Sequence, residues 1–280
     1  MKDTLYIGQI KASEIADKYG TPLYVYNEDM IKKNYNSLVE NIRYPKKKIY
    51  YACKANYNPA ILKILKGLGA GIDAVSPWEV YLSIYTGFSP DKILFTGNSI
   101  TDEEIKYIKA QGALINIDSV SELKRYGKMY PNSEISVRIN PAIGAGHHTH
   151  VITGGPGSRF GIYYNKTDEI KKIASDYNLN IIGVHMHIGS GILKPEPFLS
   201  GIKSLLNTAK EFNKLDFIDI GGGLGIPYKP EEEPLDIKKF GQELTEIFTS
   251  YAEDYGDISL ILELGRYLVA NSGILLTRVN

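Results

Sequence analysis

The sequence of 280 residues contains a single cysteine, Cys53, so no internal disulfide can form. This excludes the disulfide-stabilised scaffolds of small secreted proteins, and we expect a reducing, cytoplasmic location. No run of residues approaches the ~18 apolar positions of a transmembrane helix, and residues 1–20 lack the apolar stretch of a signal peptide. Neither sign of charge is in excess, because 32 Lys and Arg residues balance 32 Asp and Glu residues. We therefore expect neither nucleic acid nor a membrane as a partner.

The composition, with 43% hydrophobic and 23% charged residues, is typical of a globular protein. Apolar, β-branched runs alternate with stretches of helical periodicity, and Gly, Pro or Asn separates them. Helical stretches include residues 58–69, 101–112 and 236–256. The predicted strands are residues 48–54, 71–76, 92–97, 113–118, 134–140, 181–189, 217–223 and 260–266.

Eight strand-then-helix units predict an α/β fold, a (β/α)8 barrel of the TIM type, for which ~250 residues is typical. An open, doubly wound sheet is the alternative. Residues 1–26 form an N-terminal segment that leads into the barrel and includes a further strand at 22–26, and residues 27–270 form the barrel. Residues 271–280 contain a strand without an evident partner, which predicts the beginning of a C-terminal β-domain.

Polar residues gather where the predicted strands end. Active sites of such barrels lie at the carboxyl ends of the strands, whereas the opposite ends here carry mostly lysines and apolar residues. This asymmetry predicts an active-site face. Its members are Lys54, Asn56, Asp73, Ser76, Asn98, Asp118, Arg138, Asn140, His185, His187, Gly221, Gly222, Gly223, Glu263 and Arg266.

Lys54 closes an otherwise apolar strand, which permits two interpretations. A lysine at a strand end can extend its ammonium to solvent with no further role. A lysine partly desolvated at the mouth of a barrel would have a lowered pKa and could form a Schiff base with an aldehyde. Cys53 should point the opposite way and lie in the core.

The glycine-rich run from Asp219 to Gly225 follows the seventh strand. Consecutive glycines let backbone N–H groups converge on an anion, and barrels often bind phosphate after strands seven and eight. A tight turn is the alternative. Glu263 and Arg266 follow on the eighth strand, either as a structural ion pair or as groups that hold a cofactor ring nitrogen and a phosphate or carboxylate.

The histidines form two clusters. His185 and His187 should lie on the same side of their strand, since side chains alternate along it. Such a pair can bind a metal ion, or one imidazole can stack on an aromatic cofactor. His147, His148 and His150 lie in a glycine-rich loop and could serve a ligand or a lid.

Together these motifs resemble the fold-type III pyridoxal-phosphate decarboxylases, whose barrel is similar to that of alanine racemase. The motifs follow one another in the order of that family and extend from about residue 22 to the last residue. They are YACKAN (51–56), GIDAVSPWEV (71–80), FTGNS (95–99), VRINP (137–141), TGGPGSRFGI (153–162), GVHMHIGSG (183–191), DIGGGLGIPY (219–228) and LELGRYLVANSG (262–273).

The resemblance implies pyridoxal 5'-phosphate as cofactor and no metal. It implies that Lys54 is the Schiff-base lysine, that His187 stacks on the ring and that Glu263 pairs with the ring nitrogen. Arg266 would also lie close to a substrate carboxylate. The resemblance further implies acidic groups near the cofactor at Asp73 and Glu79. Phosphate-binding residues would be Ser190, Gly221, Gly222, Gly223, Gly265 and Arg266.

The implied activity is that of a carboxy-lyase, with meso-2,6-diaminopimelate as substrate and L-lysine as product, in lysine biosynthesis. A carboxylate at Glu263 favours ring protonation and thus decarboxylation over racemisation. Ornithine, arginine and carboxynorspermidine are alternative substrates. A non-catalytic pyridoxal-phosphate carrier and a metal-dependent hydrolase that uses the histidines are alternatives of other classes.

The family pattern differs at two positions, where Leu264 replaces a proline and Gly191 a glutamine. The resemblance also implies a β-domain beyond residues 271–280, which supplies the acid that returns a proton to the product. Proteins similar to this one are homodimers in which that domain reaches the partner's active site.

Overall fold

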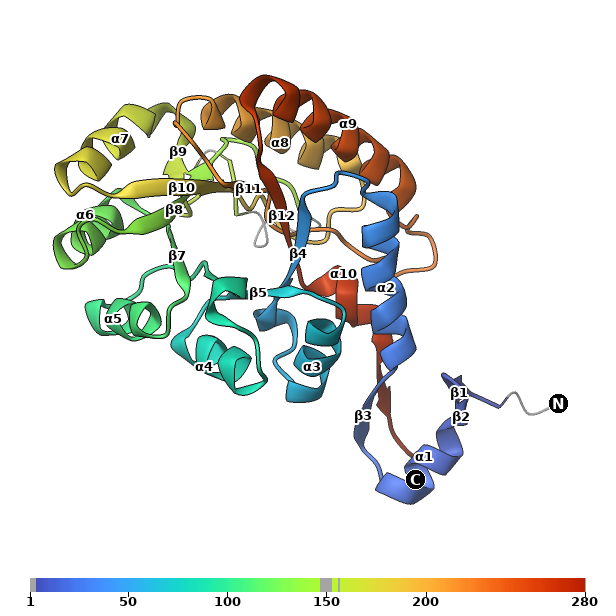
Figure 1. Ribbon diagram of the computed structural model, residues 1–280. Coiled ribbons are helices and arrows are strands. Elements are labelled where there is room, and N and C mark those ends of the chain that lie inside the picture. The colour runs from blue at the N-terminus through green and yellow to red at the C-terminus, as the bar shows by residue number, and fades with distance from the viewer. Residues whose placement is uncertain (1–3, 147–152, 156, 280) are drawn as a thin grey trace.

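The computed structural model describes residues 4–146, 153–155 and 157–279. Eight parallel strands follow one another around a closed barrel, and pairing of β8 with β10 closes the ring (Figure 1). The predicted (β/α)8 barrel is confirmed, and the doubly wound alternative is wrong. The barrel strands are β4 (Lys47–Ala52), β5 (Gly71–Ala74), β6 (Ile93–Phe95), β7 (Leu114–Ile117), β8 (Glu134–Asn140), β10 (Asn180–His185), β11 (Phe217–Asp219) and β12 (Ser259–Leu264).

Several strands end earlier than predicted, because the glycines and polar residues after them belong to turns. Strand β11 ends at Asp219, and Gly221 then adopts a φ of +70°, which suits a glycine. The short strand β9 (Ile162–Tyr163) pairs with β8 beside the barrel. Lys54 and His187 thus lie just beyond the ends of their strands, whereas His185 and Glu263 lie on the last residues of theirs.

Helices cover the outside of the barrel (Figure 1). Several begin at residues whose side chains accept a hydrogen bond from the first turn, such as Asn27 before α2 and Thr101 before α5. Their apolar faces pack on the strands in one large core. The helices of this ring are α2 (Glu28–Asn41), α3 (Pro59–Gly67), α4 (Pro77–Tyr85), α5 (Asp102–Ala110), α6 (Val120–Met129), α7 (Thr167–Asp176), α8 (Pro195–Ala209) and α9 (Ile237–Tyr255).

The barrel interior is layered. A cluster of buried hydrophobic side chains, Tyr50, Leu94, Phe217 and Ile261, fills it toward the amino ends of the strands. Side chains alternate along a strand, so the residues two positions further on point into the same interior. Three of these four residues are polar, since Thr96 follows Leu94, Asp219 follows Phe217 and Glu263 follows Ile261; the fourth, after Tyr50, is Ala52. An apolar plug therefore supports a buried polar layer at the carboxyl ends of the strands.

A second, two-stranded sheet joins the two ends of the chain. Strand β3 (Leu23–Tyr26) pairs antiparallel with β13 (Gly273–Leu276), so the expectation of an unpartnered terminal strand is wrong. Helix α1 (Ala12–Tyr19) and the hairpin of β1 (Tyr6–Ile7) and β2 (Ile10–Lys11) lie beside this sheet (Figure 1). We propose that a second domain, if it starts at residues 271–280, also includes β3.

The connection from β12 to this sheet is helical. It consists of α10 (Arg266–Val269) and the 3-10 turn η5 (Ala270–Ser272). No helix in the described ranges is long and apolar enough to cross a lipid bilayer.

Candidate active site

A cavity of about 350 Å³ opens at the carboxyl ends of the strands. Its lining brings together residues predicted from three separate motifs, Lys54, His185, His187 and Glu263. A larger cavity of about 590 Å³ lies at the amino ends of β4 and β5 and contains none of these predicted residues. We assign the site by its chemistry rather than by its volume.

Lys54 lies in the 3-10 turn η1 (Cys53–Ala55), two residues past the end of β4, whereas the predicted strand 48–54 included it. Its ammonium is 2.5 Å from Oδ2 of the buried Asp73, and the Thr96 hydroxyl donates to the other carboxylate oxygen. Burial acts to lower the pKa of Lys54, but the charge and hydrogen bond of Asp73 together with the charge of Glu263 outweigh it, and the pKa is raised. The expectation of a lowered pKa is wrong for this arrangement. Cys53 is buried in the core, as predicted.

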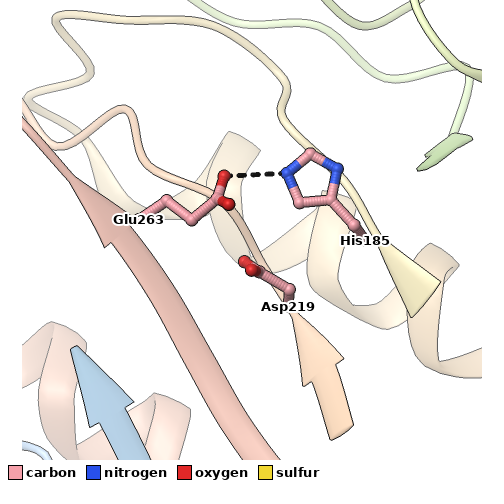
Figure 2. A group of neighbouring side chains, drawn as sticks. All are labelled: His185, Asp219 and Glu263. Carbon is pink, nitrogen blue, oxygen red and sulfur yellow. Dashed lines mark hydrogen bonds and ion pairs between the residues drawn. The ribbon is translucent and has the colours of Figure 1, made fainter. Parts of the chain in front are cut away.

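Glu263 on β12 is bound by His185 on β10, whose Nε2 lies 2.8 Å from the Glu263 Oε2 (Figure 2). Burial acts to raise the pKa of Glu263, but the His185 ring and the Lys54 ammonium outweigh it and hold the pKa below its ordinary value. The other oxygen, Oε1, is buried without a hydrogen-bond partner. A buried carboxylate oxygen of this kind fits a positively charged ring N–H. Glu263 pairs with His185 and not with Arg266, so the structural ion pair considered from the sequence is not observed.

Asp219 on β11 lies beside this pair (Figure 2). Its Oδ1 accepts a hydrogen bond of 2.7 Å from the Gly221 N–H. Burial and the nearby Glu263 charge raise the pKa of Asp219 well above its ordinary value. His185, Asp219 and Glu263 each place a ligand atom within 4.8 Å of the others, close enough to share a metal ion. His187 is not part of this group. The His185 and His187 pair is therefore not brought together as a metal site.

His187 lies two residues past the end of β10 and lines the same cavity as His185, as the alternation predicted. The Gly222 N–H donates to its Nδ1 over 3.2 Å, which leaves the ring hydrogen on Nε2. Burial, followed by the positive charge of Arg138, lowers the pKa of His187 well below its ordinary value. A neutral, oriented imidazole suits stacking on an aromatic ring, and we keep this role as a proposal.

The glycine run after β11 lies closely against neighbouring backbone. A Cβ at Gly221 would lie 2.2 Å from the Met186 carbonyl oxygen, and one at Gly222 would lie 1.9 Å from the Glu263 carbonyl oxygen. Gly223 has the same constraint, with 2.5 Å to the Gly189 carbonyl oxygen. Only glycine fits at these positions. A glycine-rich turn of this kind suits an anion, although the Gly221 and Gly222 N–H groups donate here to Asp219 and His187.

Basic and hydroxyl groups border the glycine run. The Arg266 Nε lies 3.3 Å from the Ser190 Oγ, and its Nη1 donates to the Tyr228 hydroxyl over 2.5 Å. Gly265 precedes Arg266, and a Cβ there would lie 2.9 Å from the Ala55 Cβ. A guanidinium, a hydroxyl and backbone amides are the groups that bind phosphate. The residues present therefore fit pyridoxal phosphate at both ends, with the free oxygen of Glu263 for the ring nitrogen.

The substitution Gly222→Ala tests this cradle. The added methyl group would overlap the Glu263 carbonyl, so we expect a loss of about 1–3 kcal/mol of stability and weaker cofactor binding. Thermal unfolding and a spectroscopic titration with pyridoxal phosphate measure both effects. Gly67→Ala is the matched control, because a Cβ at this helical position meets nothing within 4 Å. Unchanged unfolding and unchanged binding in Gly222→Ala would contradict the close approach.

Some predicted residues lie elsewhere. Glu79 does not line the cavity; its Oε2 accepts a hydrogen bond of 2.7 Å from the Val75 N–H. His147, His148 and His150 lie outside the described residues. Sequence reasoning missed Thr96 and Asn116 as members of the polar layer. The signal for Asn116 is a single amide within the apolar strand LINI.

Comparison with known proteins identifies the family. Residues 28–270 match the model described as "Pyridoxal-dependent decarboxylase, pyridoxal binding domain". The diaminopimelate decarboxylase of Methanothermobacter thermautotrophicus is 46% identical over 100% of this chain and 68% of its own length. That of Aquifex aeolicus is 35% identical over 98% of this chain and 66% of its own length. The chain thus spans about two thirds of the curated relatives it matches.

A comparison with solved structures identifies the same family. The crystal structure of diaminopimelate decarboxylase from M. jannaschii in complex with L-lysine has a TM-score of 0.87 and 33% identity, and the match covers 98% of this chain and 68% of that one. Fold and site together define a pyridoxal-phosphate-binding barrel of the amino-acid decarboxylase class. Within that class, the chain belongs to the diaminopimelate decarboxylase family.

Proposed function

We propose that the protein decarboxylates meso-2,6-diaminopimelate to L-lysine, in the cytoplasm and as a homodimer. Curated relatives named diaminopimelate decarboxylase and the L-lysine complex of one of them support the substrate and the product. The observation that carries the chemistry is the buried Glu263, a carboxylate with one free oxygen in the cavity that Lys54 also lines.

Pyridoxal phosphate, when bound, supplies an aromatic ring that accepts the electron pair left on the α-carbon as the carboxylate leaves as carbon dioxide. The residues of this chain bind the cofactor and the substrate and orient them. Lys54 would provide the amine that holds the cofactor. Its ion pair with Asp73 fixes the ammonium at the mouth of the barrel.

The remaining residues set charge and position. Glu263 keeps a negative charge where the ring nitrogen would lie, which favours protonation of that nitrogen. The neutral His187 would cover a ring face without adding a charge that would oppose this proton. The glycine run with Ser190 and Arg266 would hold the phosphate, and the Arg266 guanidinium would also attract a substrate carboxylate.

A direct assay tests this function. The cofactor-loaded protein is incubated with meso-diaminopimelate, L-ornithine or L-arginine, and carbon dioxide and the amine products are quantified. We expect L-lysine from meso-diaminopimelate at a rate at least about tenfold above the other substrates, since one mismatched polar group costs at least that much. Preferred turnover of ornithine or arginine would contradict the substrate. Retained cofactor with no turnover of any substrate would contradict catalysis.

A further inference from the structure

A buried chain of hydrogen bonds crosses the barrel interior and ends on Glu263. The Ser136 hydroxyl on β8 donates to the Asn116 Oδ1 over 2.8 Å, and the Asn116 Nδ2 on β7 lies 3.3 Å from the His185 Nδ1. The His185 Nε2 lies 2.8 Å from the Glu263 Oε2. Ser136 and Asn116 are fully buried, and His185 and Glu263 are 1% and 4% exposed. Four strands thus contribute one side chain each to a single chain of contacts.

Asn116 fixes which groups donate and which accept in this series of hydrogen bonds. A side-chain amide nitrogen can only donate hydrogen bonds, so the His185 Nδ1 that faces it must act as the acceptor. The ring hydrogen of His185 then lies on Nε2 and is donated to Glu263. A second proton on Nδ1 would face the hydrogens of the amide without an acceptor. Asn116 therefore opposes the imidazolium form of His185.

The tautomer of the His185 ring matters because charged groups surround Glu263. The other charged groups that face it are the Lys54 ammonium, the Arg138 guanidinium, and the carboxyl groups of Asp73 and Asp219. An imidazolium at His185 would lie closest and would cancel the carboxylate charge at hydrogen-bond distance. A neutral N–H instead orients the carboxylate and leaves its charge for the group that meets the free Oε1.

We propose that Asn116 is a positioning residue, which holds His185 as the neutral Nε2–H tautomer so that Glu263 is oriented and charged toward the ring nitrogen of the cofactor. This inference rests on the proposed function for its catalytic consequence. The tautomer itself does not depend on cofactor or substrate.

Nitrogen NMR of the ¹⁵N-histidine-labelled protein without cofactor tests the first part. The His185 signals are assigned by their loss in His185→Asn. We expect one protonated and one unprotonated ring nitrogen, with the proton on Nε2. A proton on Nδ1, alone or with one on Nε2, would overturn the proposal, and this result requires no variant of Asn116 to fold.

The substitution Asn116→Asp tests the consequence, because it replaces the amide donor by an acceptor of the same shape. We expect both ring nitrogens of His185 to become protonated, and the ¹⁵N signal of labelled pyridoxal phosphate to shift toward the unprotonated ring. The kcat for decarboxylation should fall about tenfold, a size typical of a lost outer hydrogen-bond partner, with KM nearly unchanged. Asn34→Asp is the matched control: Asn34 is buried, but its Nδ2 bonds to Leu268 and Asn271.

The outcomes separate the two proposals. An unchanged His185 tautomer and ring-nitrogen signal in Asn116→Asp would overturn the positioning role, whatever the activity. The same spectral changes in Asn34→Asp would also overturn it, because they would report a general effect of a buried acid. The expected tautomer in a protein that does not decarboxylate meso-diaminopimelate would contradict the proposed function alone and would support the role of Asn116.

Discussion

Replacing Lys54 by arginine is expected to abolish covalent attachment of pyridoxal phosphate and to lower decarboxylation by about 10³-fold or more. Arginine keeps a cation beside the buried Asp73, so the 2.5 Å ion pair of the native lysine has a substitute and the fold should persist. A guanidinium does not deprotonate in proteins and cannot provide the neutral amine. The absorbance near about 420 nm that such imines give should disappear.

Lys48→Arg is the matched control, since Lys48 lies on the same strand β4 but toward its amino end and is exposed. It should keep the absorbance, the attachment and the activity. Mass spectrometry of protein reduced with borohydride would locate the cofactor on the peptide that contains Lys54. A yellow, covalently loaded Lys54→Arg protein would show that another lysine holds the cofactor.

Glu263→Gln is expected to retain the cofactor and to lower kcat by about 10²–10³-fold, the size typical of removing one preorganised electrostatic partner. Glutamine keeps an oxygen that can accept the His185 hydrogen bond of 2.8 Å. It lacks the negative charge that favours a protonated ring nitrogen, so the ring would attract the α-carbon electron pair less strongly. Single-turnover kinetics and a cofactor titration separate the two effects.

Glu122→Gln is the control for the loss of a buried carboxyl group. Burial raises the pKa of Glu122 to about 8, so this side chain is mostly uncharged at neutral pH. Its replacement removes little charge and should leave kcat within about twofold. A Glu263→Gln protein as fast as the wild type would show that the charge at this position does not assist the reaction.

The barrel could be predicted because the local patterns agree with the global fold. All eight predicted strands exist, although 71–76 ends at Ala74 and 217–223 ends at Asp219. The hydrophobic pattern does not show where the hydrogen bonds between strands end, because the residues just beyond Asp219 remain buried although they belong to the turn. The pairing of β3 with β13 joins residues about 250 positions apart. No local signal specifies such a pair.

The site was only partly predictable, for a similar reason. Strand-end position and motif identified Lys54, His187 and Glu263. The direction of the Lys54 pKa depends on Asp73, which lies across the register from Ala52 on the neighbouring strand. From the sequence one can expect a lysine at the barrel mouth to be desolvated. The sequence does not reveal which carboxylate the pairing of the two strands places beside that lysine. Asn116 was missed because its partner His185 is brought to it only when the barrel closes.

A crystal structure of the cofactor-loaded protein tests the central claim most directly. We predict density that is continuous from the Lys54 Nζ to pyridoxal phosphate, the Glu263 Oε1 within hydrogen-bond distance of the ring nitrogen, and the phosphate beside the glycine run of Gly221 to Gly223. A cofactor joined to a different lysine, or a ring nitrogen that faces a group other than Glu263, would contradict the account.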